Sequence, residues 1–179
     1  MLKILIPSVE VFNERDSTFE ETREMSLSLE HSLVSVSKWE SKWCVPFLSK
    51  NEKTSQQTLD YIRCMTLTQN VNDDVYGLLT ASNFEAIKEY IDAPMTATTI
   101  NQTDQRRSRE VITSEIIYYW MVALNIPFEC QKWHLNRLLT LINVCSIKQQ
   151  PPKKLSRSSA LRSQAALNAQ RRAMMNTGG

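Results

Sequence analysis

The chain has 179 residues, with 21 basic and 19 acidic side chains and a net charge of +2. This length suits one domain with an appendage, and a total of three glycines argues against an all-β fold with many glycine turns and against a phosphate-binding loop. Seven basic residues and no acidic residue lie between positions 148 and 179. The other 14 basic residues stand against 19 acidic ones, so we expect an acidic body of net charge near −5 followed by a basic tail.

Neither a membrane-spanning segment nor a signal peptide is expected. Every apolar run is far shorter than a membrane span, and the start, MLKILIPSVEV, lacks a small-residue cleavage site. Four cysteines stand at unrelated spacings without a CxxC pair. We expect these to be reduced and buried: Cys44, Cys64, Cys130 and Cys145.

The N-terminal region predicts strands. Residues 1–12 are rich in β-branched side chains, and Pro7 interrupts them, which favours an edge strand. Residues 13–22 are polar, and residues 23–29 then alternate with a period of two. We therefore expect residues 23–29 to form an antiparallel pair with the N-terminal strand.

Helices follow in the next part of the chain. Apolar residues at helical spacing predict a helix over 31–44 that Pro46 ends, with Ser37 and Glu40 as a capping box for a shorter version. Asn72-Asp73-Asp74 predicts a turn or a helix cap.

Two further capping boxes predict two further helices. The box Thr54–Gln57 precedes a helix near 55–66, and the box Ser82–Glu85 precedes a helix that Pro94 closes. Residues 95–112 are β-prone at both ends and polar between, which predicts a hairpin-like excursion.

The most apolar stretch, residues 113–148, predicts two helices joined at Asn125-Ile126-Pro127. The first is apolar on almost every face, which is typical of a helix that is buried on all sides or lies in an assembly. The second is expected to run unbroken from Phe128 to Lys148. After a break at 149–152, residues 155–175 favour a helix that has few apolar residues and should order against another molecule.

Together these elements predict a mainly α (α+β) fold. Residues 1–148 form a helical body with a small N-terminal or peripheral β element, drawn from the N-terminus, residues 23–30 and residues 95–112. Residues 149–179 form a basic, helical C-terminal arm.

Candidate catalytic and metal-binding residues are sparse. Cys130 and His134 are four apart on a predicted helix and could share a metal ion, but a tetrahedral site needs two more ligands and the other cysteines are isolated. A packed helix with a locally hydrogen-bonded histidine is the competing interpretation. We expect no metal and no cofactor.

A set of residues for nucleophilic catalysis could combine Cys130 or Cys145 with His134 and an asparagine, Asn136 or Asn143. When two catalytic residues lie on one helix, a third is rarely placed to complete the nucleophile–base–acid arrangement. The chain also has no nucleophile elbow. The paired carboxylates Glu20-Glu21 and Asp73-Asp74 lie in polar turns. We therefore predict that the protein is not an enzyme and has no catalytic residues.

Two groups of side chains are candidates for binding a partner. Trp39 and Trp43 are i, i+4 on a short helix, and we expect them to be partly exposed, against the alternative of a core position. The basic tail could follow nucleic-acid phosphates, but it lacks aromatic residues, and its alanines and leucines favour docking on an acidic protein surface, with a solvated tail as the third alternative. Its candidate residues are Lys153, Lys154, Arg157, Arg162, Arg171 and Arg172.

Several runs resemble a family of small proteins from the structural-gene clusters of tailed bacteriophages, over nearly the whole chain. They are SKWESKWCVPFLSKNEKT (37–54), APMTATTI (93–100), VITSEIIYYWMVALNIPFECQKWHLNRLLTLINVCSIK (111–148) and the ending AALNAQRRAMMNTGG, with WHLNRLLTLI the most specific. The resemblance implies a tail assembly chaperone, which binds the tape-measure protein during tail morphogenesis. It carries over no binding or catalytic residue.

The same resemblance leaves a structural virion subunit as the alternative: a tail, connector or baseplate component that stitches its neighbours through terminal arms. A nucleic-acid-binding protein that uses the basic tail is the second alternative. The implied partners are tape-measure or other virion proteins in a homo-oligomer or larger assembly. The implied location is the host cytoplasm during phage assembly, or the virion.

Overall fold

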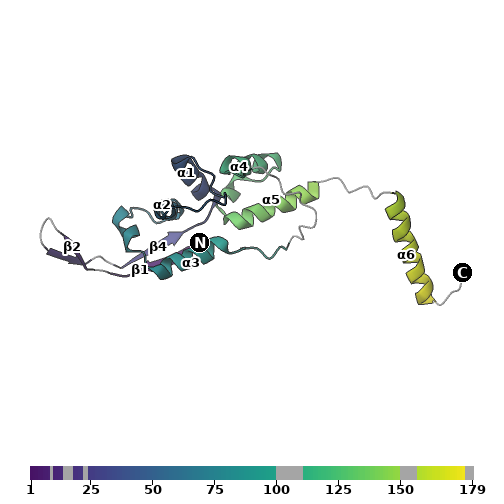
Figure 1. The fold of residues 1–179 in the computed structure, drawn as a ribbon, viewed down its shortest axis with the longest axis horizontal. Coiled ribbons are helices and arrows are strands. Elements are labelled where there is room, and N and C mark those ends of the chain that lie inside the picture. The colour runs from purple at the N-terminus through teal and green to yellow at the C-terminus, as the bar shows by residue number, and fades with distance from the viewer. Residues whose placement is uncertain (9, 14–17, 22–23, 100–110, 150–156, 176–179) are drawn as a thin grey trace. The chain divides into compact units, whose positions relative to one another are not determined.

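The computed structural model describes the chain except for residues 9, 14–17, 22–23, 100–110, 150–156 and 176–179. The protein is mainly α-helical with a small β element, which confirms the predicted fold class (Figure 1). The chain divides into two compact units, Met1–Ser146 and Ile147–Gly179.

The β element of the first unit pairs β1 (Leu2–Ile6) with β4 (Met25–Leu29) in antiparallel register, with Leu2 opposite Leu29 and Ile6 opposite Met25. This pair is the one that the sequence predicted, and Pro7 follows the end of β1. One face enters the core through four buried side chains: Ile4, Ile6, Leu27 and Leu29.

A second hairpin joins β2 (Glu10–Asn13) to β3 (Thr18–Glu21), with Phe12 opposite Phe19. The sequence did not predict β3, because residues 13–22 lack the alternation of apolar and polar side chains on which the prediction depends. The single strand that was expected over residues 1–12 is divided between two sheets.

The next helices are α1 (Leu33–Trp43), α2 (Ser55–Met65), the 3₁₀ segment η1 (Asp73–Leu78) and α3 (Ala81–Asp92). The capping box at Thr54 and Gln57 is confirmed, since each side chain accepts a hydrogen bond from the other residue's backbone N–H, at 3.2 and 2.9 Å. Asn72 caps η1, as expected.

Two other capping boxes are not used. Helix α1 falls within the predicted range 31–44, but the shorter version that would start at the Ser37 box is wrong, because Ser32 caps the helix and its Oγ accepts from the N–H of Ser35 at 3.3 Å. Helix α3 is capped by Thr80 and not by Ser82. In both cases a hydroxyl residue two or more positions upstream has the extended backbone that an N-cap requires.

The hairpin expected over 95–112 is not found at its two described ends, because neither 95–99 nor 111–113 forms a strand. Met95 has a positive φ of 49°, and the hydroxyl of Thr96 accepts from the N–H of Thr98 at 3.1 Å. Such local hydrogen bonds compete with strand pairing. The tip of the expected hairpin lies outside the described residues.

Helix α4 (Ser114–Ala123) ends before a turn at Asn125, where φ is 53°, and the 3₁₀ segment η2 (Phe128–Lys132) and helix α5 (Leu135–Gln149) follow. The prediction of one unbroken helix from Phe128 to Lys148 is therefore wrong. His134 starts α5 anew, because its Nδ1 lies 3.3 Å from the donating N–H of Asn136, and the N–H of Leu135 donates to the carbonyl of His31 at 2.8 Å.

The core of the first unit is one contiguous cluster, to which every helix of that unit contributes. Helix α1 packs against α2 and α4, while α3 lies against β1 (Figure 1). The apolar side of α5 points inward, with residues 135, 138 and 142 buried and residues 139 and 145 half-buried. Both α4 and α5 therefore contribute buried side chains to the core.

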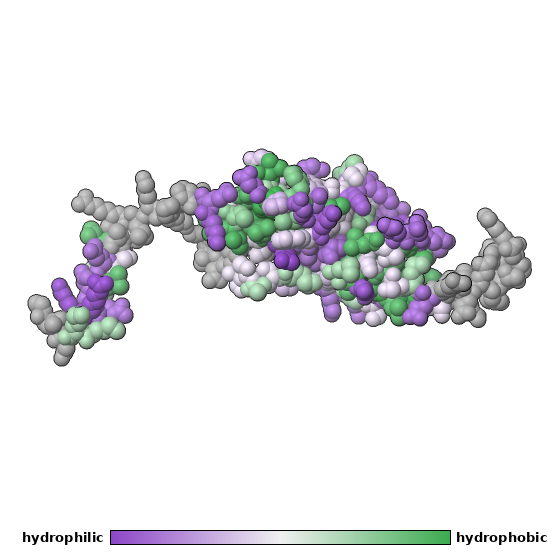
Figure 2. Space-filling view, turned by 180° about the vertical axis from the view of Figure 1, so that it is seen from behind, coloured by the Kyte–Doolittle hydropathy of each residue, from purple (hydrophilic) through white to green (hydrophobic). Residues whose placement is uncertain are grey.

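The second unit contains α6 (Arg157–Met175), which confirms a C-terminal helix. Side chains along α6 from position 161 to position 175 are exposed. Figure 2 shows this helix carrying both hydrophilic and hydrophobic side chains.

Candidate functional site

Two histidines meet in the interior of the first unit, at the junction of β4 with α1 and at the start of α5. The rings of His31 and His134 are 5.0 Å apart, edge to face, and both residues are buried. His31 is hydrogen-bonded to the hydroxyl of Tyr61, while Nε2 of His134 donates to the carbonyl of Tyr90 at 2.9 Å. The two imidazoles are thus held by groups from helices α2 and α3.

This cluster continues to the N-terminus. The hydroxyl of Tyr90 donates to Glu30 Oε1 at 2.7 Å, and the other oxygen of Glu30 lies 2.8 Å from the N-terminal ammonium of Met1. Burial and, to a smaller extent, the neighbouring His134 together lower the pKa of His31 to about 3. Burial also lowers the pKa of His134, although the hydrogen bond to the carbonyl of Tyr90 acts in the opposite direction. Both histidines are therefore neutral in the folded protein at neutral pH.

Cys130 and His134, which were considered as two ligands of one metal ion, do not lie on one helix. Cys130 lies in η2, and the Nε2 of His134 is directed to a backbone carbonyl. Within the described ranges, no group of three or more histidine, cysteine, aspartate or glutamate side chains is placed to hold a metal ion.

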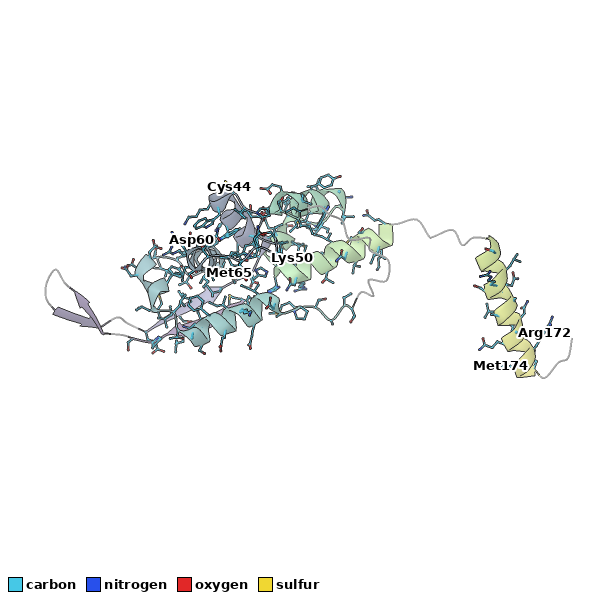
Figure 3. All side chains as sticks on the ribbon, viewed as in Figure 1. Cys44, Lys50, Asp60, Met65, Arg172 and Met174 are labelled. Atoms are coloured by element: carbon cyan, nitrogen blue, oxygen red, sulfur yellow. The ribbon has the colours of Figure 1, made fainter. Side chains whose placement is uncertain are left out.

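Two members of the candidate catalytic set, His134 and Asn136, have structural hydrogen-bond partners. The amide of Asn136 donates to the carbonyls of Ile91 and Ala93, at 3.0 and 2.8 Å, and so links α5 to the end of α3. All four cysteines are free thiols, but only Cys130 is buried, contrary to the expectation that all are: Cys64 and Cys145 are half-buried and Cys44 is exposed. Cys44 ends α1 with a positive φ of 53° (labelled in Figure 3).

The paired carboxylates have structural partners where the structure describes them. Asp73 lies 3.3 Å from the Nε of Arg63, and Asp74 accepts from the amide of Asn72 at 3.0 Å. Glu20 and Glu21 lie in β3, and their side chains are outside the described set.

The two tryptophans proposed for partner binding differ in their burial. Trp39 is 1% exposed, and its Nε1 donates to the carbonyl of Gln57 at 2.8 Å, so the expected exposure of Trp39 is wrong. Trp43 is half-buried, with its ring centre 6.4 Å from that of Trp39. Hydrophobic spacing placed both residues on one stripe but could not tell which end of the stripe the other helices cover.

The basic candidates belong to the second unit. Arg162, Arg171 and Arg172 are exposed on α6, Arg157 is its first residue, and Lys153 and Lys154 lie outside the described residues. Leu161, Leu167, Met174 and Met175 of the same helix are more than half exposed. Helix α6 therefore presents apolar and basic side chains, and no acidic one, to solvent.

An exposed apolar surface on α4 and η2 was not identified from the sequence. Tyr119 is 68% exposed, Val122 59% and Phe128 53%, and we call these three residues the α4–η2 strip. The sequence signal was present, since a helix that is apolar on almost every face should be buried on every face or available to a partner. Here Ile117 and Met121 face the core while the strip faces solvent.

A shallow groove of about 440 Å³ runs beside α5, between that helix and the segment after α3. Its lining includes Met95, Trp133, Leu141 and Val144, and the guanidinium of Arg137 lies 4.3 Å from the centre of the Trp133 ring. Among the described residues that line the groove, Arg137 is the only charged one.

Comparisons with protein families, curated proteins and solved structures gave no match to this chain. Of the helices that the structure describes, none combines the length and the apolar character needed to cross a membrane.

Proposed function

We propose that this protein is a non-enzymatic tail assembly chaperone of a bacteriophage, which binds the tape-measure protein during tail morphogenesis in the host cytoplasm. The family resemblance supplies the biological setting of the proposal. A tape-measure protein is a long helical chain whose apolar stripes need cover until tube subunits enclose it. A protein that presents apolar surface and a basic helix is suited to that role.

The observation that carries the proposal is the exposure of α6. The helix has 19 residues and no acidic side chain, and its leucines and methionines face solvent together with three arginines. A helix with so little apolar content is only marginally stable alone and gains stability by docking. A partner with acidic and apolar side chains would satisfy both features of α6.

Co-purification from phage-infected cells tests this function. We expect the full-length protein to bring down the tape-measure protein and to be absent from purified particles by mass spectrometry. Replacing Arg171 and Arg172 by glutamate should reduce recovery of the tape-measure protein by about tenfold. Lys88→Glu, an exposed charge reversal on α3, is the matched control and should leave recovery unchanged.

The alternative is a structural virion subunit that stitches neighbours through its arms. It is favoured by the hairpin β2–β3, which joins no other strand among the described residues and could pair with a neighbouring copy. Mass spectrometry of purified particles separates the two functions, because a virion subunit is present there at a fixed copy number.

A nucleic-acid binder is the second alternative, favoured by the arginines of α6. Its affinity would fall steeply with salt concentration, and removal of residues 150–179 would abolish it. Binding of labelled DNA and RNA at two salt concentrations identifies this function directly.

A further inference from the structure

Helix α4 has one face that no other described element covers. Its exposed members are Glu115, Tyr119, Val122 and Ala123, at the i, i+4, i+7 and i+8 positions of a single helical face. Glu115 is also the only charged residue of the helix. The uncovered face therefore begins with a carboxylate and continues with apolar side chains.

Segment η2 extends this face. Tyr118 lies one turn before Val122 at the edge of the face, and its ring centre is 6.4 Å from that of Phe128. The hydroxyl of Tyr118 donates to Gln131 Oε1 at 2.9 Å, which ties α4 to η2. The turn between them is held because the N–H of Ile126 donates to the carbonyl of Met121 at 2.8 Å. The α4–η2 strip is thus a supported surface.

An acidic pocket of about 340 Å³ lies at the N-terminal end of α4, next to the strip. It is lined by Glu40, Ser41, Cys44, Val45, Pro46, Thr113 and Glu115, so its two charged residues are carboxylates. The oxygens of Glu40 accept the N–H groups of Phe47 and Ser114, each at 2.7 Å, which fixes that carboxylate. The pKa of Glu115 is lowered by hydrogen bonds from its own N–H and from Thr113, so Glu115 is anionic at neutral pH.

We propose that the α4–η2 strip and the acidic pocket together bind a basic amphipathic helix of a partner protein. An arginine of that helix enters the pocket beside Glu115, and leucine- or methionine-sized side chains cover Tyr119, Val122 and Phe128. Charge complementarity selects this occupant, since both charged residues among the described lining of the pocket, Glu40 and Glu115, are carboxylates. The inference rests on the proposed function and names the kind of client segment that the chaperone would hold.

The spacing of the surface defines the client sequence. Glu115 and Val122 are seven residues apart, or about 10 Å along the helix axis. A partner helix that lies along α4 therefore needs an arginine with apolar residues four and seven positions away. A nucleic acid, in contrast, would be repelled by the carboxylates.

The first experiment measures binding of the full-length protein to a synthetic helical peptide of about twenty residues that has this pattern. We expect Glu115→Lys and Val122→Glu each to weaken binding by about tenfold or more. Tyr119→Ala is a milder substitution on the same surface, at a residue that is two-thirds exposed. Circular dichroism verifies that each variant is folded. Glu85→Lys, an exposed charge reversal on α3, is the control and should bind as the wild type does.

A charge swap tests the pocket itself. A peptide with glutamate in place of its arginine should bind the wild type weakly and regain affinity for the Glu115→Lys protein. Equal binding by all variants would overturn the proposal. So would self-association of the full-length chain that Glu115→Lys dissociates, because the occupant would then be a second copy.

Co-purification separates this inference from the proposed function. If the tape-measure protein is recovered equally well with Glu115→Lys and Val122→Glu, the function stands and the assigned surface is wrong. If the peptide result holds but no tape-measure protein is recovered, the surface stands and the chaperone function is wrong.

Discussion

Glu40 is a buried carboxylate that joins three segments of the body. It lies on α1, and it accepts backbone N–H groups from Phe47, in the following loop, and from Ser114, at the start of α4. A carboxylate suits this position because both of its oxygens accept hydrogen bonds, and because negative charge is stabilised near a helix N-terminus. Glu40 therefore sets the approach of α4 to α1.

Glu40→Gln should lower the free energy of unfolding by about 1–3 kcal/mol, because the amide directs an NH₂ group at one of two N–H donors. Urea unfolding followed by circular dichroism measures the change. The control is Glu52→Gln at an exposed position, which should change stability by less than about 0.5 kcal/mol. An equally small effect at position 40 would show that the buried carboxylate is dispensable.

The histidine pair makes stability depend on pH. The pKa of His31 is lowered from 6.5 to about 3 by burial and by His134. Between these two pH values, His31 is protonated in the unfolded chain but neutral in the folded chain. The contribution of His31 to the free energy of unfolding is fully present above pH 6.5 and is lost as the pH falls toward 3. Tyr61 and His134 are the titratable groups that contact the ring.

We expect the free energy of unfolding to fall by a few kcal/mol between pH 7 and pH 4, beyond the contribution of the carboxylates. His31→Gln should flatten this part of the curve, because glutamine can hydrogen-bond to Tyr61 without titrating. The measurement is urea unfolding at a series of pH values. Parallel curves for the two proteins would contradict the role assigned to His31.

At the scale of elements, α5 has the clearest division between core and surface. Leu138 is fully buried, whereas Ile147 on the same helix is 49% exposed. Leu138→Ala should cost about 2–5 kcal/mol because it leaves a cavity, and Ile147→Ala should cost less than about 1 kcal/mol. Thermal or urea unfolding distinguishes them. Similar costs at both positions would mean that the buried face of α5 is assigned wrongly.

Local chemistry explains which elements were predictable. The box at Thr54 and Gln57 needs only its own four residues, so sequence alone located the start of α2. The start of α5 depends on His31, about a hundred positions earlier, whose carbonyl accepts the N–H of Leu135. Pattern alone therefore joined η2 and α5 into one helix. Strand β3 was missed because its pairing with β2 has no local signal.

At the scale of the whole molecule, the chain combines a body with its own core and a helix without one. Every buried residue lies between Met1 and Ser146, as far as the described residues show, and α6 is exposed at the positions from 161 to 175. Removal of residues 150–179 should therefore change the melting temperature of the body by no more than a few degrees. Scanning calorimetry of the two chain lengths measures it, and a collapse of the shorter chain would contradict this division.

The same removal should weaken association with the tape-measure protein while leaving peptide binding at the α4–η2 strip intact. Two surfaces of different charge would then act separately: basic on α6 and acidic beside α4. Loss of both activities on truncation would instead indicate one composite surface.

What the sequence determined by itself is the helical class, the β1–β4 pair, the break at Asn125 and the basic C-terminal helix. Each follows from periodicity, composition or a cap within a few residues. Only the tertiary structure decided which face of each helix is covered, so that Trp39 is buried while Tyr119 and Val122 are exposed. Burial depends on packing between segments that are far apart in the chain. In a helix with apolar residues on most faces, the local sequence does not indicate which face stays exposed.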